Sequence, residues 1–320
     1  MTDSERRNKR AVVALGGNAI TRENIEDTIS NQFFHTRSAL ESIVELAGQG
    51  YDLCITHGNG PQVGNALLRV ELARGKAPIL PLGICVADTE GGMGYMIEQS
   101  IQNRLDHESI DRRSCTIITQ MVVDANDPSI TNPTKYIGQF YSEEQARKLA
   151  AESGWKVKAD GDRGWRRVVA SPLPITCVEK NIIKTLIDNR VIVIAAGGGG
   201  VPVYVDPERG YEGVDAVIDK DRASAVLGRE IGAGILMLLT SVDQVAINFG
   251  QPDQKNLGKI SASQLKTYFE EGHFPAGSMG PKVEAALDFL QNGGQEVIIT
   301  SFELAAPALV GEAGTRIHPD

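Results

Sequence analysis

Cysteine is scarce in this sequence, and its four residues, Cys54, Cys85, Cys115 and Cys177, lie far apart without a C-x-x-C pair. This spacing indicates neither a disulfide framework nor a zinc site. Cys54 and Cys115 fall in apolar, strand-like runs, where we expect buried thiols. Cysteine usage of this kind fits a reducing compartment, so we expect a cytoplasmic protein.

Basic residues are outnumbered by acidic ones, which gives a formal net charge of −9 and a pI near 5.2. This charge argues against nucleic acid as the main partner. No apolar run is long enough to span a membrane, and the charged N-terminus has no apolar signal core, so we expect no membrane partner. With 42% hydrophobic residues in 320, the chain can form one large α/β domain or two closely packed lobes.

Several familiar catalytic motifs are also missing. There is no G-x-x-x-x-G-K-[ST] sequence, which excludes a P-loop enzyme. The stretch "GNGPQVG" at 58–64 is one residue longer than the dinucleotide fingerprint. We find no Ser-His-Asp order and no His or Cys cluster with metal-ligand spacing, so the sequence predicts no metal site formed by protein ligands alone.

Apolar β-branched runs alternate with helical patterns along the chain, which is typical of a parallel sheet with crossover helices. The predicted strands are 10–15, 52–56, 115–123, 191–196, 234–239 and 296–301. The predicted helices are 31–49, 61–74, 88–105, 179–189, 221–231 and one that follows Pro281.

The segment 124–178 interrupts this alternation. It opens with a polar stretch rich in Asp, Asn, Pro and Gly, and continues with a short helix at 142–152 capped by Ser142. Two short strands are predicted around "WKVKA" and "WRRVVAS". We interpret the segment as a small subdomain that projects from the main sheet, and polar loops of this length in enzymes usually have a function.

The 34 glycines are clustered at the ends of predicted elements, in "ALGGNAI" (14–20), "THGNGPQVGN" (56–65), "AAGGGGVPV" (195–203) and "AGSMGPK" (276–282). Glycine at the carboxyl ends of strands lets backbone N–H groups approach an anion. A single Gly-Gly is more simply a tight turn, but four such clusters indicate phosphate or nucleotide binding.

Three lysines are candidates to oppose the anion. Lys282 is the strongest, because it lies at a predicted helix N-terminus, where a cation costs a few tenths to about 1 kcal/mol unless an anion is present. Lys220 lies between Asp219 and Asp221 at another helix start, and Lys135 lies in the polar loop of 124–178. Each has an ordinary alternative, as a solvated or incidental lysine.

Other residues near the glycine turns have two possible readings. His57 can touch a ligand or make a structural hydrogen bond, and Asn18 and Asn59 can bind ligand or serve the turn. The stretch 240–250 can line a base pocket with Val242, Val245 and Phe249, or form an ordinary strand-exit loop or hairpin.

The segments together resemble the carbamate kinases, within the broader amino acid kinase family. The resemblance covers nearly the whole chain. The matching stretches are "ALGGNAI", "THGNGPQVGN", "NPTKYIGQFYSEEQA", "AAGGGGVPV", "VDAVIDKDRAS", "LLTSVDQVAINFG" and "FPAGSMGPKVEAA".

The resemblance implies a three-layer αβα sandwich around a mostly parallel sheet, with a carbamate lobe at 1–190 that includes 124–178, and a nucleotide lobe at 191–320. It implies ADP or ATP with Mg²⁺, carbamoyl phosphate or carbamate as substrate, and a homodimer. The implied catalytic residues are Lys135, Lys220, Lys282 and Asp221; the substrate cradle is Gly16, Gly17, Asn18, Gly58, Asn59, Gly60, Gly198 and Gly199; and the nucleotide residues are Asp219, Lys220, Thr240, Ser241, Val242, Met279 and Lys282.

One departure from the broader family is informative. Most amino acid kinases carry a lysine in the first strand, whereas this strand reads "VVALGG". By the resemblance, Lys135 supplies the missing charge, which favours the carbamate kinases over the glutamate and N-acetylglutamate kinases. The alternatives are a kinase for another small carboxylate on the same fold, and a nucleotide-sensing protein without catalysis.

Overall fold

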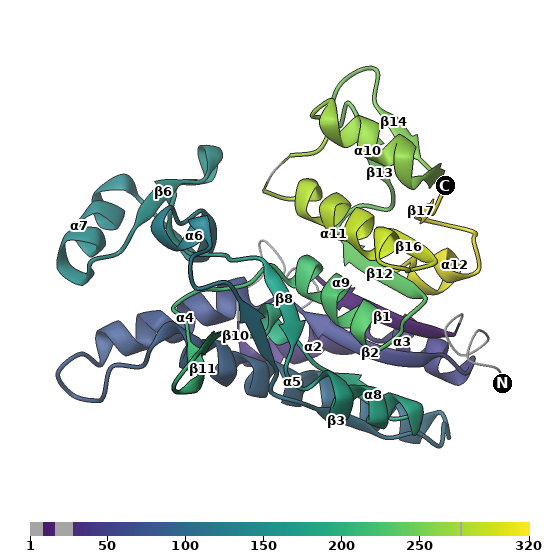
Figure 1. The fold of residues 1–320 in the computed structure, drawn as a ribbon, viewed down its shortest axis with the longest axis horizontal. Coiled ribbons are helices and arrows are strands. Elements are labelled where there is room, and N and C mark those ends of the chain that lie inside the picture. The colour runs from purple at the N-terminus through teal and green to yellow at the C-terminus, as the bar shows by residue number, and fades with distance from the viewer. Residues whose placement is uncertain (1–8, 17–27, 276) are drawn as a thin grey trace.

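A computed structural model describes residues 9–16, 28–275 and 277–320 and is built around a central sheet of eight strands (Figure 1). In spatial order the strands are β15 (Lys259–Ser261), β17 (Thr315–His318), β16 (Glu296–Ser301), β12 (Ile235–Thr240), β1 (Arg10–Leu15), β2 (Asp52–His57), β9 (Ile192–Ile194) and β3 (Ser114–Thr116). All neighbours pair in parallel except β16 and β17. The prediction of a mostly parallel central sheet is therefore confirmed.

Helices cover both faces of this sheet. In β1, Val12 and Ala14 belong to one buried cluster, while Ala11 and Val13 belong to another, because successive side chains of a strand point to opposite faces. The first cluster is completed by α8 (Lys180–Asp188), α9 (Lys220–Glu230), α10 (Ala262–Glu270) and α11 (Met279–Gln291). The second is completed by α2 (Ile29–Ala39), α3 (Glu41–Gly48), α5 (Leu82–His107) and α12 (Ala305–Leu309). The predicted three-layer αβα arrangement is confirmed.

The single strand predicted at 115–123 is wrong. The chain leaves the central sheet after β3 and enters a second sheet as β4 (Gln120–Val123). That sheet has the order β11 (Gly210–Gly213), β10 (Val201–Asp206), β4 and β8 (Pro174–Cys177). Ile117 and Ile118 continue the apolar pattern between the two strands, so hydrophobicity alone could not mark the switch.

Two helix predictions also differ from the structure. The helix predicted at 31–49 is two helices, α2 and α3, separated at Leu40. The helix predicted at 88–105 begins six residues earlier, because α5 starts at Leu82 directly after Pro81. Pro81 has no N–H to donate and ends the preceding segment in an extended conformation.

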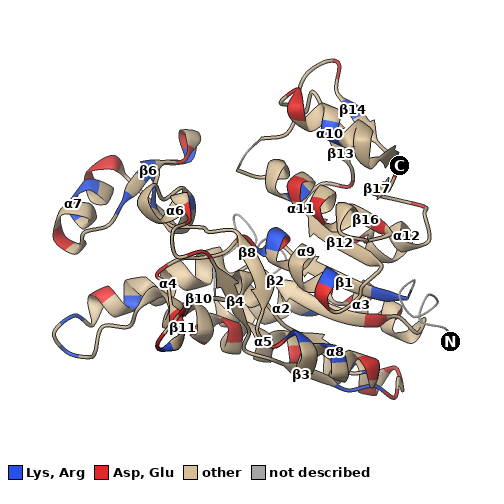
Figure 2. Ribbon diagram, viewed as in Figure 1, with Lys and Arg blue, Asp and Glu red and all other residues tan. Residues whose placement is uncertain are grey.

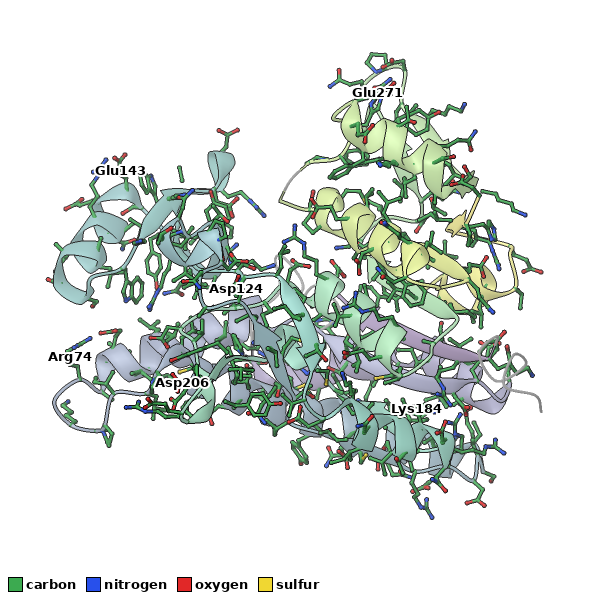
Figure 3. All side chains as sticks on the ribbon, in the orientation of Figure 1. Arg74, Asp124, Glu143, Lys184, Asp206 and Glu271 are labelled. Carbon is green, nitrogen blue, oxygen red and sulfur yellow. The ribbon has the colours of Figure 1, made fainter. Side chains whose placement is uncertain are left out.

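The segment that follows β4 forms a small separate sheet, seen in Figure 1 to one side of the central sheet. Its strands are β5 (Lys135–Tyr141), β7 (Trp165–Val169) and β6 (Val157–Ala159), accompanied by α6 (Pro128–Thr131), α7 (Glu143–Ser153) and a short 3-10 helix, η2 (Gly161–Arg163). Figure 3 labels Asp124 near the start of the segment and Glu143 on α7. Ser142 caps α7 through a capping box, as the sequence indicated.

The position of Lys135 differs from its prediction, because it is the first residue of strand β5 rather than part of a loop. The lobe boundaries at 1–190 and 191–320, and the subdomain limits of 124–178, remain predictions. The remaining elements are α4 (Gly60–Leu72), η3 (Gly197–Gly199) and a hairpin of β13 (Val245–Ile247) and β14 (Lys255–Leu257). No helix in the described part of the chain is long and apolar enough to cross a membrane.

Strand β5 rests on helix α4 through two glycines. A Cβ atom added to Gly64 of α4 would lie 1.9 Å from the Cα atom of Gly138 in β5, which is far inside van der Waals contact. Gly138 has φ +74°, a conformation that favours glycine. The close approach of the small sheet to α4 therefore requires glycine at position 64 for space, and glycine at position 138 suits the backbone conformation.

We predict that Gly64→Ala lowers the free energy of unfolding by about 1–3 kcal/mol, because β5 must move away from α4. Urea unfolding measures the loss, and hydrogen exchange is expected to rise in 135–141. The matched control is Gly92→Ala on α5, where an added Cβ meets nothing within 4 Å. That control should be neutral or more stable by up to about 1 kcal/mol. Equal stability of Gly64→Ala and the wild type would contradict the prediction.

Candidate active site

A cavity of about 390 Å³ opens at the carboxyl ends of the parallel strands. Gly16 follows β1, Gly58 follows β2, and Thr240 ends β12, so three neighbouring strands deliver residues to the same place. Residues predicted from the sequence that line this cavity are Gly16, Gly58, Asn59, Gly60, Lys135, Gly198, Asp219, Lys220, Asp221, Thr240, Ser241 and Lys282. Gly17 and Asn18 lie outside the described residues, and Gly199 does not line the cavity.

The three candidate lysines meet in this cavity although they come from three different elements. Lys220 Nζ lies 2.5 Å from Asp221 Oδ1, and Lys282 Nζ lies 3.0 Å from Asp221 Oδ2. Lys135 Nζ reaches across from β5 and lies 2.5 Å from Asp219 Oδ2. Two carboxylates therefore hold three ammonium groups at one end of the sheet, and Figure 2 shows acidic and basic residues together at the start of α9.

Local structure fixes the two carboxylates. Asp219 is the N-cap of α9, and its Oδ1 accepts hydrogen bonds from the backbone N–H groups of Asp221 and Arg222. Asp221 lies in the first turn of α9, where a carboxylate is favoured by the helix dipole. Because both acids are held by the same helix end, the lysines that pair with them are positioned as well.

Burial and ion pairing have opposite effects on the pKa values of the two aspartates. For Asp221, burial raises the pKa, but the charges of Lys220 and Lys282 outweigh it, so the pKa lies below its ordinary value. The same balance, with Lys135 as the strongest cation, lowers the pKa of Asp219. Both aspartates are therefore ionised over the physiological pH range, and they keep opposing charge next to the lysines.

The lysines respond differently to the same surroundings. Burial lowers the pKa of Lys220, and the pairing with Asp221 offsets only part of this effect. For Lys282, burial also lowers the pKa, but Asp221 outweighs it and the pKa is raised. Lys282 is the fourth residue of α11, so a cation near a helix N-terminus is stabilised here by a carboxylate from another helix.

A glycine turn at 196–200 forms another wall of the cavity. Gly198 has φ +63°, and a Cβ there would lie 2.1 Å from Nδ2 of Asn59. Asn59 Nδ2 in turn donates to Thr89 Oγ1 at 3.0 Å, which fixes the orientation of the amide. Glycine is required at position 198 because the side chain of Asn59 occupies the space beside it.

Two titratable residues lie buried behind this turn. Burial, together with the charge of Lys220, lowers the pKa of His57 to about 4, and its Nδ1 donates to Gly58 O at 3.2 Å. His57 does not line the cavity, so the geometry supports a structural hydrogen bond rather than contact with a ligand. Burial raises the pKa of Glu90 well above its ordinary value. Glu90 Oε2 accepts from the N–H of Thr119 at 2.8 Å.

A second cavity of about 240 Å³ adjoins the first, and Thr240, Ser241, Ser278 and Lys282 line both. Val242, Phe249 and Met279 contribute apolar surface to it. Val245 is fully buried in the core and does not line it, so the suggestion that it belongs to a base pocket is wrong. The two cavities together form one polar end and one more apolar end, as a nucleotide with its phosphates requires.

The sequence of this chain is similar to known kinases along nearly its whole length. The family model for the amino acid kinase family matches residues 9–301. The carbamate kinase of Pyrococcus furiosus is 45% identical over 97% of this chain and 99% of its own length. The chain belongs to the amino acid kinase family. A carbamate kinase-like protein of Escherichia coli is 47% identical over 96% of this chain and 98% of its own length.

Solved structures agree with this assignment. Carbamate kinase from Giardia lamblia bound to AMP-PNP has a TM-score of 0.90 and 42% identity, and the match covers 98% of this chain and 100% of that one. This amino acid kinase thus shares both sequence and fold with carbamate kinases along nearly its whole length.

Several residues that line the first cavity were not predicted from the sequence. They are Pro61, Tyr136, Ile137, Arg166, Val217, Ile218, Gly277, Ser278, Pro281 and Phe302. Arg166 is the most polar of them, and "WRRVV" reads only as a strand with basic residues. Which face of that strand meets the cavity depends on how the small sheet packs, and no local pattern encodes it.

We predict that the stability of Glu90→Gln relative to the wild type increases as pH rises. The raised pKa means that the folded state binds the Glu90 proton more tightly than the unfolded state does. The stability that Glu90 contributes is therefore complete below the ordinary pKa near 4.5 and is lost as pH rises toward the folded-state value. Glutamine keeps an oxygen acceptor for Thr119 without this loss.

The measurement is the free energy of unfolding of both proteins at pH 5 and pH 8. Relative to the wild type, the variant should have a higher free energy of unfolding at pH 8 than at pH 5. The control is Glu98→Gln, the same change of side chain on the same helix at a position that is only partly buried. A pH-independent difference for Glu90→Gln would show that its carboxyl ionises normally.

Proposed function

We propose that the first cavity is the active site of a carbamate kinase, which converts carbamoyl phosphate and ADP into carbamate and ATP, reversibly. The observation that supports this most directly is the meeting of Lys135, Lys220 and Lys282 in one cavity. Three cations around one space, with glycine N–H groups beside them, suit the charge that develops on a transferring phosphoryl group. The carbamate kinase relatives, aligned over nearly the whole chain, support the same reaction.

The nucleotide belongs in the second cavity. Thr240, Ser241, Val242 and Met279 line it, and Lys282 lies at its border with the first. In this arrangement the base lies against Val242 and Met279, and the terminal phosphate extends toward Lys220 and Lys282. The relative from Giardia lamblia that binds AMP-PNP supports nucleotide binding by this fold. The C-terminal lobe at 191–320 would then hold the nucleotide.

Carbamoyl phosphate belongs in the first cavity, between Asn59, the glycine turns and Lys135. Residues of the N-terminal lobe at 1–190 predominate on this side: Gly16, Gly58, Asn59, Gly60 and Lys135 line the cavity. Gly198 completes the cradle beside Asn59, and Gly199 supports the turn by packing against Ile218. Gly17 and Asn18 are included in the cradle by family resemblance alone.

The reaction requires no general base. Carbamate and the terminal phosphate of ADP are both anions at neutral pH, so either can attack phosphorus without losing a proton. The protein then has two tasks, to align the reactants and to neutralise charge on the moving oxygens. Asp221 fits the first task, since it holds the ammonium groups of Lys220 and Lys282 at fixed positions. ATP formation is the expected direction, because carbamoyl phosphate is a mixed anhydride.

Magnesium is the expected companion of the nucleotide. Among the described residues no group of three or more His, Cys, Asp or Glu side chains is placed to hold a metal ion. Asp219 and Asp221 both face the cavity, but each is already paired with lysine. The residues thus fit an ion held mainly by phosphate oxygens and water, and when bound there Mg²⁺ would neutralise charge on the phosphates.

We also propose a homodimer in the cytoplasm, as the family resemblance implies. The supporting observation is a cavity of about 530 Å³ between α2, α4 and α5, lined in part by the exposed apolar side chains of Ile29, Leu80 and Tyr95. Sedimentation should give a mass near twice the 34.4 kDa of the chain. A monomer at micromolar concentration would contradict the proposal.

The test of the proposed function is ATP formation from ADP, carbamoyl phosphate and Mg²⁺. Wild-type protein should form ATP with carbamoyl phosphate and much less with acetyl phosphate. Preference for acetyl phosphate would identify a kinase for another carboxylate. ADP binding without turnover of either compound would identify a nucleotide-sensing protein.

In the same assay, Lys282→Ala should lower kcat by about 100-fold or more, because the lysine stabilises charge in the transition state. Its melting temperature should also fall, because Asp221 loses one of its two lysine partners. Lys135→Ala should raise the KM for carbamoyl phosphate and leave ADP affinity unchanged. Equal loss of both affinities in Lys135→Ala would refute the division of the two substrates between the lobes.

A further inference from the structure

Arg166 is a buried cation in the first cavity that has no role in the reaction as described so far. It lies on β7 in the small sheet, its side chain is 15% exposed, and it lines the cavity together with Lys135. It does not line the second cavity. Arg166 is therefore on the side of the site that the nucleotide does not occupy.

The guanidinium of Arg166 is held rigidly from three directions. Its Nε and Nη2 donate to Gly138 O at 3.1 and 2.8 Å, and its Nη1 donates to Asp160 Oδ2 at 3.3 Å. Its central carbon lies 4.9 Å from the ring centroid of Phe140. The position of the group is thus fixed before any ligand arrives, which lowers the entropy cost of binding one.

These contacts leave part of the hydrogen-bonding capacity unused. A guanidinium has five N–H donors, and the bonds to Gly138 and Asp160 occupy three of them. One N–H therefore remains on each of Nη1 and Nη2, and both can donate to the oxygen atoms of a bound anion.

Charge at this position is also incompletely compensated. Asp160 pairs with both Arg163 and Arg166, so one carboxylate serves two guanidinium groups. Lys135, the other cation of the small sheet at the cavity, already has Asp219. The excess positive charge therefore lies on the arginine pair, and Arg166 is the member that reaches the cavity.

We infer that Arg166 is a substrate-binding residue that recognises the carbamate group: the carboxylate of carbamate in one direction, and the carbonyl oxygen of carbamoyl phosphate in the other. The inference rests on the proposed function. Carbamate is small, planar and anionic, and it must lie on the far side of the phosphoryl group from the nucleotide. Arg166 and Lys135 are the cations on that side.

The test compares Arg166→Ala with Arg163→Ala. Arg163 is a matched control, since it makes the same kinds of contact, with Asp160 and with Phe140 at 5.1 Å, but its side chain is 59% exposed and does not line the cavity. Loss of a charge-assisted hydrogen bond should raise the KM for carbamoyl phosphate by about tenfold or more. The Kd for ADP should stay within about twofold, and Arg163→Ala should change neither by more than about twofold.

A purely structural role gives a different result. If Arg166 only holds Gly138 and Phe140 in place, Arg166→Ala will lower stability. The KM for carbamoyl phosphate will then stay unchanged, or it will change together with ADP affinity. Either result overturns the inference. Arg166→Lys keeps the charge without the fork and should also raise this KM, so it serves if the alanine variant does not fold. Added guanidinium ion should restore activity to Arg166→Ala selectively. Wild-type ATP formation from the same substrates separates failure of this inference from failure of the proposed function.

Discussion

The buried pairing of aspartates with lysines at the start of α9 is the interaction on which the site depends. Asp221 is 3% exposed and holds Lys220 and Lys282, which come from two different helices. Removing one partner of such a cluster leaves an uncompensated charge in a poorly solvated place, which is costly. The packing of α9 against α11, and of both against the sheet, is therefore tied to the same residues that face the cavity.

Much of the fold was predictable because its signals are local. The strands at 10–15 and 296–301 and most of the helix around Pro281, which begins at Met279, follow from periodicity, and the glycine clusters marked the sheet end where the cavity lies. The break between β3 and β4 was missed, because Ile117 and Ile118 between them continue the apolar pattern of the strands. The β10–β11 hairpin was also missed, although Asp206, Pro207 and Gly210 form a turn signal between its two strands.

The residues of the candidate site also fall into those that the sequence could identify and those that it could not. Lys220 and Lys282 were identifiable because each is a cation near a predicted helix start, whereas the role of Asp221 came from the resemblance. Lys135 was a candidate from its polar loop, and its place in β5 came only with the structure. Arg166 and Glu90 had no sequence signal, because an arginine in a strand and a glutamate in a helix are ordinary until tertiary packing buries them.

The contact between Gly64 and Gly138 has a mechanical consequence. Two backbone surfaces touch there without side chains between them. Around this contact, Val63 and Leu67 of α4 pack with Ile137 of β5 in one buried cluster, so helix and strand are joined by apolar side chains on either side of the glycines. Lys135 and Arg166 belong to the same small sheet as Gly138, and Arg166 is bonded to its carbonyl oxygen. Any displacement of β5 relative to α4 would therefore move both cations together.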